Sequence, residues 1–403
     1  MSKLSYLENL LDGVEVEWLP LWKVTIWDKK FNAVDRKKQP KVINYQYLLA
    51  AELFKLEQKN GDVFLLSTGE KTGWTNEVLA GSYLREGEVV TIPWGKSRPV
   101  KDVIKYYKGR FVTADNRIAT SNNTAVLLNK YLYYWMMHQS QLIDSYYRGS
   151  GIQHPSMADV LDMLIPIPSV AIQSEIVRIL DKFTALTAEL TAELTAELTT
   201  RKKQYNYYRD QLLSFDEGKV EWKMLGEITD INTGSKPTEL INTLTDFDYI
   251  NAGTSRSGYS KKSNCEGDTV TTPSRGQGGI GYVGYQRKPF WLGPLCYKLQ
   301  SIDNRVLLNK YLFYFLQSKS CLLLDLKKEG GVPAVNKSDL IKLEIPLPSL
   351  VKQQKIVKYL DKFDALTNSI SEGLPREIEL RQKQYEYYRD LLFNFPKPKP
   401  VTN

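Results

Sequence analysis

The sequence predicts an α/β (α+β) fold in which two similar globular domains are separated by two long antiparallel helices, with a circular, pseudo-twofold order. Three observations predict it. The chain repeats itself at a fixed offset, each copy ends in a long helix-favouring segment, and the start of the chain resembles its central junction. The expected boundaries are a first domain at 1–168, a central helical region at 169–217, a second domain at 218–348 and a C-terminal helical region at 349–403.

Internal repetition is the strongest signal in the chain. Five segments recur at a displacement of 180 residues. They are EGEVVTIP (86–93) with EGDTVTTP (266–273), LLNKYLYYW (127–135) with LLNKYLFYF (307–315), IPIPSV (165–170) with IPLPSL (345–350), IVRILDKFTALT (176–187) with IVKYLDKFDALT (356–367), and RKKQYNYYRDQLL (201–213) with RQKQYEYYRDLLF (381–393).

The repeat is also circular. VEW at 16–18 recurs at 220–222, a displacement of 204, so the first copy carries 24 extra residues between Trp18 and Glu86. LLDGVEVEW (10–18) resembles LLSFDEGKVEW (212–222). We therefore expect the two ends of the chain to lie close together around a pseudo-twofold axis.

Within each copy, short β-type runs such as DVFLLS, EVVTIP, DTVTTP and GYVGYQ are broken by Gly and Pro. Tyr131–Met137 and Tyr311–Gln317 are expected in short helices. Pro-rich turns, IPIPS and IPLPS, are expected to precede the long helices, with Ser169 and Ser349 as N-caps.

The long helices are expected from about residue 171 to 214 and from about 351, the second interrupted at Gly373-Leu374-Pro375. The first contains TAELTAELTAEL (187–198), which is rich in helix formers. Leu186, Leu190, Leu194 and Leu198 recur every four residues, so the leucine stripe advances about 40° per step. One interpretation is a coiled-coil seam with a slightly wrong period. The other is a ruler whose length changes by whole four-residue units.

Composition and charge restrict the class of protein. The chain has 403 residues, is 42% hydrophobic and has a net charge of +8 with a pI near 9.0, which favours a polyanionic partner. No membrane span and no secretory signal are expected. The three cysteines form no C-x-x-C pair, which fits a reduced cytoplasm. With only His138 and His154, a metal site is not expected.

Motifs of catalysis are weak or absent. GQGGIG (276–281) fits G-x-G-x-x-G, but YVGYQRKPFW follows, and this reads as a strand where a nucleotide site needs a helix. Glu57-Gln58-Lys59 has the E-x-K spacing of nucleases without a preceding Pro-Asp pair. The chain has no Asn/Asp/Ser-Pro-Pro-Tyr/Phe stretch of an amino-methyltransferase and no P-loop. No catalytic residue is therefore assigned.

The two domains, the repeated LDKF and Q-K-Q-Y-x-Y-Y-R-D helices and the TAEL array resemble the specificity subunit of a type I restriction–modification enzyme. The resemblance covers essentially the whole chain. It implies that each domain is a target-recognition domain for one half of an asymmetric, bipartite double-stranded DNA site. It also implies that the helices dock two methyltransferase subunits, which recruit the restriction subunits that translocate and cut DNA. AdoMet, ATP and Mg²⁺ would belong to those partners, and this chain would bind no cofactor.

Four segments are the best candidates for contact with DNA: 67–76 and 94–101 in the first domain, and 251–262 and 273–279 in the second. Arg and Lys side chains can pair with guanine, and Asn and Gln with adenine, while other cations hold only phosphates. The candidate contacts are Ser67, Thr68, Lys71, Thr72, Trp94, Lys96, Arg98, Lys101, Asn251, Thr254, Ser255, Arg256, Ser274, Arg275 and Gln277. Of these, Lys96, Arg98, Arg256 and Arg275 are favoured.

Aromatic and leucine side chains at i, i+3, i+7 form one face of each conserved helix. They are either helix–helix core or partner-docking surface, and the spacing does not separate the two. The residues are Tyr205, Tyr208 and Leu212 in the first helix and Tyr385, Tyr388 and Leu392 in the second. The competing hypotheses for the whole chain are a self-sufficient DNA methyltransferase or nuclease, and a coiled-coil scaffold or repressor that binds DNA without a methylating partner.

Overall fold

A computed structural model describes residues 9–96, 98–216, 218–240, 247–276, 278–328, 330–368 and 373–396. The chain divides into two compact units. The first unit comprises Met1–Thr191 together with Leu380–Asn403, and the second comprises Ala192–Glu379. The C-terminal end of the chain therefore completes the N-terminal body, as the circular repeat predicts. The boundary between the two units falls inside the long helices. The expected four-part division of the chain stays a prediction.

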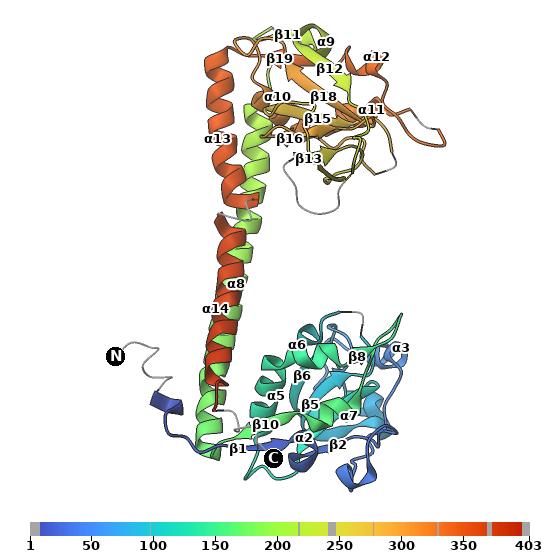
Figure 1. Ribbon diagram of the computed structural model, residues 1–403, viewed down its shortest axis with the longest axis vertical. Helices are drawn as coiled ribbons and strands as arrows, with labels where there is room; N and C mark the ends of the chain where they lie inside the picture. The colour runs from blue at the N-terminus through green and yellow to red at the C-terminus, as the bar shows by residue number, and fades with distance from the viewer. Residues whose placement is uncertain are drawn as a thin grey trace. The chain divides into compact units, whose positions relative to one another are not determined.

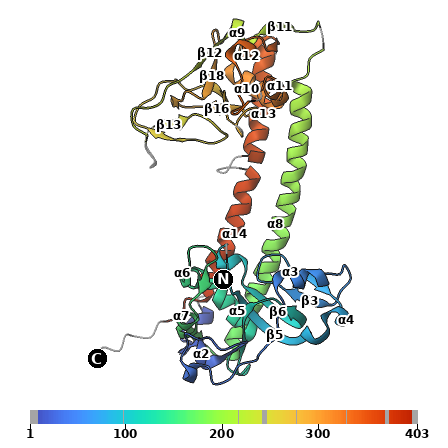
Figure 2. The same ribbon diagram turned by 90° about the vertical axis from the view of Figure 1, so that its right-hand side faces the viewer.

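The first unit is built on a mixed sheet in the strand order β2-β7-β5-β6-β3-β4 (Figure 1). Helices α5 and α6 pack beside this sheet, and two small ribbons, β1-β10 and β8-β9, complete the body (Figure 2). Its elements are β1 (Glu17–Pro20), α2 (Leu21–Val24), β2 (Thr25–Trp27), α3 (Ala50–Leu53), β3 (Val63–Leu66), β4 (Gly73–Thr75), α4 (Glu77–Ala80), β5 (Arg85–Pro93), β6 (Lys105–Thr113), β7 (Asn116–Ser121), α5 (Asn129–His138), α6 (Ser140–Ser145), β8 (Tyr147–Arg148), β9 (His154–Pro155), α7 (Met157–Asp162), β10 (Leu164–Ile167) and the start of α8 (Val170–Leu212).

The second unit repeats this framework with a smaller sheet, β12-β18-β15-β16, beside a three-stranded sheet, β14-β13-β17. The strand pairs β5-β7 and β15-β18 have the same register, Thr91 opposite Ile118 and Thr271 opposite Lys298. Its elements are β11 (Glu221–Met224), α9 (Leu225–Ile228), β12 (Thr229–Thr233), β13 (Phe247–Ile250), β14 (Gly258–Ser260), β15 (Thr269–Pro273), β16 (Gly284–Gln286), β17 (Trp291–Leu292), β18 (Cys296–Ser301), α10 (Asn309–Ser318), α11 (Ser320–Asp325), α12 (Lys337–Leu340), β19 (Glu344–Leu347), α13 (Leu350–Asn368) and the first turns of α14 (Gly373–Leu392).

The Pro-rich segments before the long helices are strands, which corrects the expected turns. Trp18 pairs with Pro166 in the ribbon β1-β10, and Trp222 pairs with Pro346 in β11-β19. A two-stranded ribbon consists only of edge strands, so proline can occupy it without removing an inner ladder bond. The carbonyl of each proline accepts a 3.0 Å bond from a buried tyrosine of the neighbouring short helix.

Each long helix is tied to its own body by the same fully buried glutamine. The Gln173 Oε1 accepts a bond from the Leu128 amide at 2.9 Å, and its Nε2 donates to the carbonyls of Val126 and Pro168 at 2.7 and 2.9 Å. Gln353 makes the matching set in the second unit, at 2.8–2.9 Å. Because each glutamine is fully buried and its amide group is satisfied by these bonds, they anchor the start of each long helix to its body.

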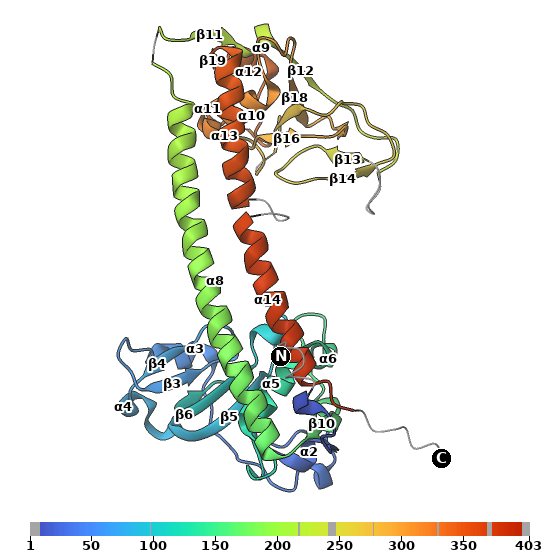
Figure 3. The same ribbon diagram turned by 90° about the vertical axis from the view of Figure 1, so that its left-hand side faces the viewer.

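The helices pair antiparallel within each unit. In the second unit Tyr205 and Tyr208 lie against Phe363, whereas Phe215, just beyond the end of α8, lies under Lys352, earlier in α13. In the first unit the Phe183 ring of α8 stacks on the Tyr388 ring of α14. Figure 3 shows the ribbons of these two helices beside each other in that unit. The fold-class prediction is therefore confirmed: the chain has two similar domains of mixed helices and strands, and a long continuous helix lies between them in the sequence.

The expected helix limits hold closely. α8 runs from Val170 to Leu212 without interruption through the TAEL array. α13 ends at Asn368 and α14 begins at Gly373, so the predicted break precedes Gly373, and Pro375 occupies the first turn of α14. Proline is tolerated there because the first amides of a helix have no intrahelical acceptor. The Ser169 hydroxyl accepts only a long 3.4 Å bond from the Ile172 amide, and Ser349 caps through its carbonyl, which accepts from Lys352 and Gln353.

The leucine stripe in α8 is only partly a seam. Leu190, Leu194 and Leu198 are half-buried, whereas Leu186 is 51% exposed and Thr187 takes the half-buried position. A four-residue repeat overruns the 3.6-residue helical turn, so one end of the stripe rotates out of the packed face.

The described ends of the chain meet within the first unit. Trp18 Nε1 donates to the carbonyl of Pro396 at 2.8 Å. This agrees with the expected closeness of the termini, although residues 1–8 and 397–403 themselves lie outside the described residues.

Candidate nucleic-acid interface

The structure brings the two candidate segments of the first domain together. Thr68–Lys71 lies opposite Gly95, Lys96 and Arg98 across a hollow of about 400 Å³. The first segment connects β3 to β4, and the second follows β5. These two strands lie on either side of β6, so two strands that share one neighbour deliver their loops to one place. Convergence of polar loops at one edge of a rigid sheet is the usual construction of a binding surface.

A half-buried lysine that the sequence analysis missed holds the first loop. Lys105, at the start of β6, donates to the Ser67 carbonyl at 2.6 Å, to the Ser67 hydroxyl at 3.0 Å and to the Gly69 carbonyl. Burial lowers the pKa of Lys105 to about 8. Ser67 is itself 2% exposed, and its hydroxyl donates within the loop to Gly69. Ser67 therefore shapes the loop and leaves Thr68, Lys71 and Thr72 to face outward.

Lys96 was predicted to contact DNA, but its side chain is buried. Its side chain is 7% exposed, forms an ion pair with Asp144 and lies 4.8 Å from the centre of the Tyr147 ring. Asp144 also accepts the Val100 amide at 2.9 Å. The ammonium group thus joins the segment after β5 to α6, so Lys96 is placed as a structural cation, and its favoured role as a DNA contact stays a prediction without structural support.

The other cationic side chains around this hollow are exposed, and each forms an ion pair with an acidic side chain. Arg98 pairs with Glu70, Lys71 with Glu57 at 2.9 Å, and Lys101 with Glu386 at 3.7 Å. Such exposed pairs contribute little to stability, about 0–1 kcal/mol, so a phosphate can replace the carboxylate at small cost. Trp94 is 41% exposed and packs its ring over that of His154, with a centroid separation of 4.2 Å.

In the second unit, Asn251 holds the first candidate segment to the sheet. Its Oδ1 accepts the Leu295 amide at 2.9 Å, and a Cβ at Gly293 would lie 2.4 Å from that oxygen. Position 293 therefore requires glycine. Because its carbonyl oxygen is engaged, Asn251 retains only its amide donors for DNA.

The two candidate segments of the second domain also meet. A Cβ at Gly279 would lie 2.8 Å from the backbone nitrogen of Gly253. Thr254, Ser255 and Arg256 are exposed beside this contact. Arg256 pairs with Asp248 at 3.1 Å and lies 4.2 Å from the centre of the Tyr259 ring, which orients its guanidinium.

Ser274 and Arg275 were both predicted to contact DNA, but the structure places them differently. Ser274 is 8% exposed, its amide donates to the Leu295 carbonyl and its carbonyl accepts from Val335. Arg275 is exposed, and it is followed by Gly276 with φ of +118°, a conformation that favours glycine. Gln277 lies outside the described residues. Of the pair, Arg275 is the residue positioned to reach a ligand.

The six candidate docking residues fall into buried and exposed groups. Tyr205 is 7% exposed and Leu392 is fully buried, so both belong to the cores of their units. Tyr388 stacks face to face on Phe183, and the Tyr385 hydroxyl accepts from Thr184 at 3.2 Å, while Tyr208 remains 46% exposed and Leu212 half-buried. The most exposed aromatics of these helices are instead Tyr207 and Tyr387, at 59% and 53%, which an i, i+3, i+7 pattern omits.

Motifs set aside in the sequence have structural explanations. Gly281 of GQGGIG is followed by strand β16, as expected, with no helix to hold a phosphate. His138 stacks on Phe393 and pairs with Asp390 at 2.8 Å. Within the described ranges, no group of three or more His, Cys, Asp or Glu side chains is arranged to hold a metal ion. Over the same ranges, the helices are too short or too polar to cross a bilayer.

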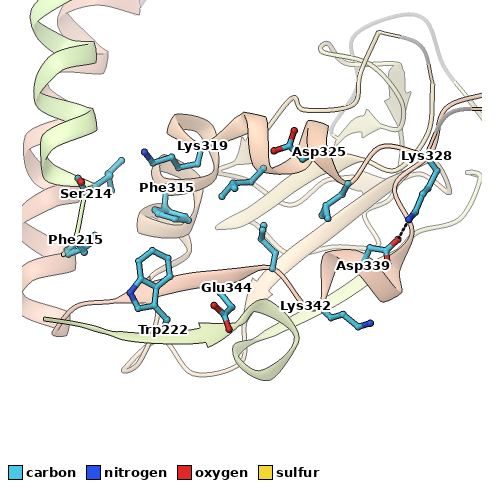
Figure 4. A pocket seen from close by; sticks show the side chains of 14 residues that line it. Ser214, Phe215, Trp222, Phe315, Lys319, Asp325, Lys328, Asp339, Lys342 and Glu344 are labelled. Carbon is cyan, nitrogen blue, oxygen red and sulfur yellow. Dashed lines mark ion pairs between the residues drawn. The ribbon is translucent and has the colours of Figure 1, made fainter. Parts of the chain in front are cut away.

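A separate hollow of about 860 Å³ lies in the second unit where α8 ends (Figure 4). Phe215, Trp222 and Phe315 line one end, and the Lys328–Asp339 ion pair, at 3.4 Å, lies at the other. None of the candidate DNA contacts lines it.

Comparison with known proteins identifies the family. Residues 43–200 and 217–380 match the model of the type I restriction modification DNA specificity domain. The chain is 39% identical to the specificity subunit of the Escherichia coli type I restriction enzyme EcoR124I/EcoR124II, over 100% of both chains. It is 31% identical to a putative type I restriction enzyme specificity subunit of Haemophilus influenzae, over 97% of this chain and 98% of that one.

The fold is also known from solved structures. The S subunit of a type I restriction-modification system from M. genitalium matches with a TM-score of 0.55 and 18% identity, covering 96% of this chain and 98% of that chain. The two units share one framework, and each carries exposed polar loops. Together with the family match, these features assign the chain to a family. The chain belongs to the type I restriction–modification specificity family, as the specificity subunit, the DNA-recognition component that is not itself an enzyme.

Proposed function

We propose that the two units read the two halves of one asymmetric, bipartite double-stranded DNA site. The observation that carries this proposal is that strands with the same kinds of pairing deliver different loops: β3 and β13 each pair antiparallel with the next strand and parallel with a later one. STGEKTGW follows β3 in the first unit, and NAGTSRSGY follows β13 in the second. Identical frameworks present their loops to DNA in the same way, whereas different side chains read different bases.

The helix α8 sets the spacing between the two half-sites. One TAEL unit adds about 6 Å and about 40° to a helix. One base pair adds about 3.4 Å and about 35° to B-DNA. The rotations nearly agree, and the unbroken course of α8 through residues 187–198 supports transmission of both changes along the helix.

Deletion of residues 195–198 tests this ruler. We expect the preferred spacer to shorten by about one base pair, with both half-sites unchanged. The measurement is genome-wide mapping of methylated bases in cells that carry the chain and its methyltransferase subunit. A control variant, in which Glu193 and Glu197 become Gln, keeps the length and must keep the spacer. An unchanged spacer in the deletion variant would overturn the ruler.

As a specificity subunit the chain acts with DNA and a methyltransferase subunit. Two methyltransferase subunits dock on the helices, where exposed Tyr207, Tyr208 and Tyr387 supply the anchors that protein interfaces favour. The restriction and translocase subunits join through them, and AdoMet, ATP and Mg²⁺ bind to these partners. The cytoplasm fits the unpaired Cys265, Cys296 and Cys321.

Methylation mapping tests the function as a whole. The isolated chain incubated with AdoMet should methylate nothing, and the complex should methylate a two-part sequence. Methylation by the isolated chain would support a self-sufficient enzyme. Salt-sensitive DNA binding without any co-purifying methyltransferase would support a scaffold or repressor, because salt sensitivity alone is common to all such binders.

A further inference from the structure

A glycine-rich hairpin occupies the same place in both units. In the first, Arg148 pairs with His154 across β8 and β9 around Gly149, Gly151 and Ile152. In the second, Lys328 pairs with Ala334, with bonds of 2.8 and 3.2 Å, around Gly330, Gly331 and Val332. Arg148 and Lys328, Ile152 and Val332, and His154 and Ala334 are each 180 residues apart, so the hairpin recurs at the same place in both copies.

Each hairpin is bonded directly to a candidate DNA-contact segment. The Lys96 amide donates to the Gln153 carbonyl at 3.0 Å, and the Gly276 amide donates to the Pro333 carbonyl at 3.0 Å. In the first unit the contact extends to the tip, since a Cβ at Gly95 would lie 2.6 Å from Cγ2 of Ile152. The hairpins thus extend the same surface that carries Arg98 and Arg275.

The tips are apolar and mostly exposed. Ile152 is 62% exposed and Val332 is 60% exposed. Gly151 and Gly331, which precede them, have open space where a Cβ would stand. In Figure 1 the hairpin of the second unit extends beyond α12 and away from α13. Single exposed apolar side chains are common, but these two recur at equivalent positions of both units, beside the candidate DNA-contact segments.

The base of each hairpin carries a cation. Arg148 and Lys328 are 75% and 62% exposed, and they pair with Asp159 at 3.3 Å and with Asp339 at 3.4 Å. The combination of a cationic base and an apolar tip matches a DNA groove, in which phosphates line the rim and the thymine methyl group lies inside. The major groove of B-DNA accommodates a two-stranded β-ribbon.

We propose that these hairpins enter the major groove, where Ile152 and Val332 make apolar contacts with base edges in opposite halves of the site. Arg148 and Lys328 contact the adjacent phosphates. This inference rests on the proposed function, since it adds a third contact element to each recognition surface. It makes Ile152 and Val332 specificity-determining residues.

The experiment measures base preference on DNA libraries randomised at one half-site at a time, bound by the full complex with methyltransferase subunits. Ile152→Ala should flatten the preference at one or two positions of one half by about fivefold, because a few apolar groups lose contact. The other half should not change. Val332→Ala should show the reverse pattern, so each unit controls for the other.

Two further variants are matched controls. Val78 and Ile302 are 89% and 65% exposed and lie outside the hairpins and the candidate segments. Val78→Ala and Ile302→Ala should keep the wild-type profile. Because all four side chains are exposed, we expect every variant to fold, and thermal unfolding checks this.

Three results would overturn the inference. The hairpin variants could keep the wild-type profile, they could lose affinity equally for every sequence, or they could lose the methyltransferase subunit, which would make the tips a protein-docking surface. Each of these leaves a wild-type complex that still selects a two-part site. A wild-type complex that selects no such site would instead overturn the proposed function.

Discussion

The two units share a framework and hold their recognition loops differently. Opposite Thr91 in the first unit stands Lys105, which binds the loop after β3. Opposite the equivalent Thr271 in the second unit stands Gly284, where a Cβ would lie 2.7 Å from the threonine hydroxyl. One position thus carries a cation that orders a loop in one copy and no side chain in the other.

The framework residues show the opposite behaviour. Gln173 and Gln353 make the same three bonds, and Tyr134 and Tyr314 donate to Asp181 at 2.6 Å and Asp361 at 2.5 Å. The comparison teaches that the chain keeps the attachment of body to helix constant while the loops diverge. Constant attachment is what allows two different readers to address one DNA duplex in a defined register.

Breaking the attachment should have the largest effect. Gln173→Ala removes the partner of the buried Pro168 carbonyl and of the part-buried Leu128 amide and Val126 carbonyl, which should lower the free energy of unfolding of the first unit by about 2–4 kcal/mol. Gln353→Ala should do the same to the second unit. Denaturant unfolding combined with hydrogen exchange measures which unit opens. Gln354→Ala is the control, because Gln354 is exposed on the next position of α13.

Equal losses in the two units would confirm that the attachments are equivalent. A loss below about 1 kcal/mol for either glutamine would show that water replaces its bonds, and the attachment would then lie elsewhere.

Much of this framework could be predicted from the sequence, because a fixed offset between copies requires no knowledge of packing. The circular order and the short helices follow from it, whereas the convergence of the candidate loops within each unit came only from the structure. The strands at Pro166 and Pro346 were missed because proline signals a turn in the local sequence. Only the pairing with the partner strand shows that each proline lies on an edge strand, where its missing N–H is tolerated. Lys105 was missed because a lysine in an alternating strand reads as an exposed residue.

Side-chain roles were less predictable than positions. Helical spacing placed Tyr205 and Tyr208 on one face, yet one is buried and the other is nearly half exposed. Spacing describes a single helix, whereas burial depends on the neighbour that covers it. Likewise, Lys96 reads as a DNA cation until Asp144, which is distant in sequence, is found beside it.

Removing the loop-ordering cation should have an intermediate effect confined to one half-site. Lys105→Met deletes charge-assisted bonds to Ser67 and Gly69, and we expect affinity for one half-site to fall about tenfold. Competition binding with each half-site altered in turn measures it. Lys108→Met is the control, since Lys108 lies on the same strand with its side chain 71% exposed.

The pH dependence sharpens this prediction. With a pKa of about 8, Lys105 loses its proton as the pH rises through that value, and the neutral amine has one N–H fewer for its three acceptors. Reading of that half-site should weaken above pH 8, and the other half should not follow. Stability should change in the opposite sense. Between pH 8 and the usual lysine pKa of 10.5, the unfolded chain binds more protons, so the contribution of Lys105 to stability rises with pH. Lys105→Met should abolish both dependences.

The smallest predicted effect concerns the helix pairs, where identical residues pack differently. Phe183 and Tyr388 stack at 5.0 Å with their planes 1° apart, whereas the equivalent Phe363 and Tyr208 lie 6.1 Å apart at 25°. A double-mutant cycle with leucine at both positions should give a coupling of about 1 kcal/mol in the first unit and about half of that in the second. The looser pair leaves Tyr208 46% exposed, which makes its ring available to a methyltransferase subunit. Tyr208→Leu should therefore weaken assembly of the complex more than Tyr388→Leu does, although it destabilises the isolated chain less. The reverse order in sedimentation measurements of assembly would show that the tightly stacked pair, and not the open one, forms the docking surface.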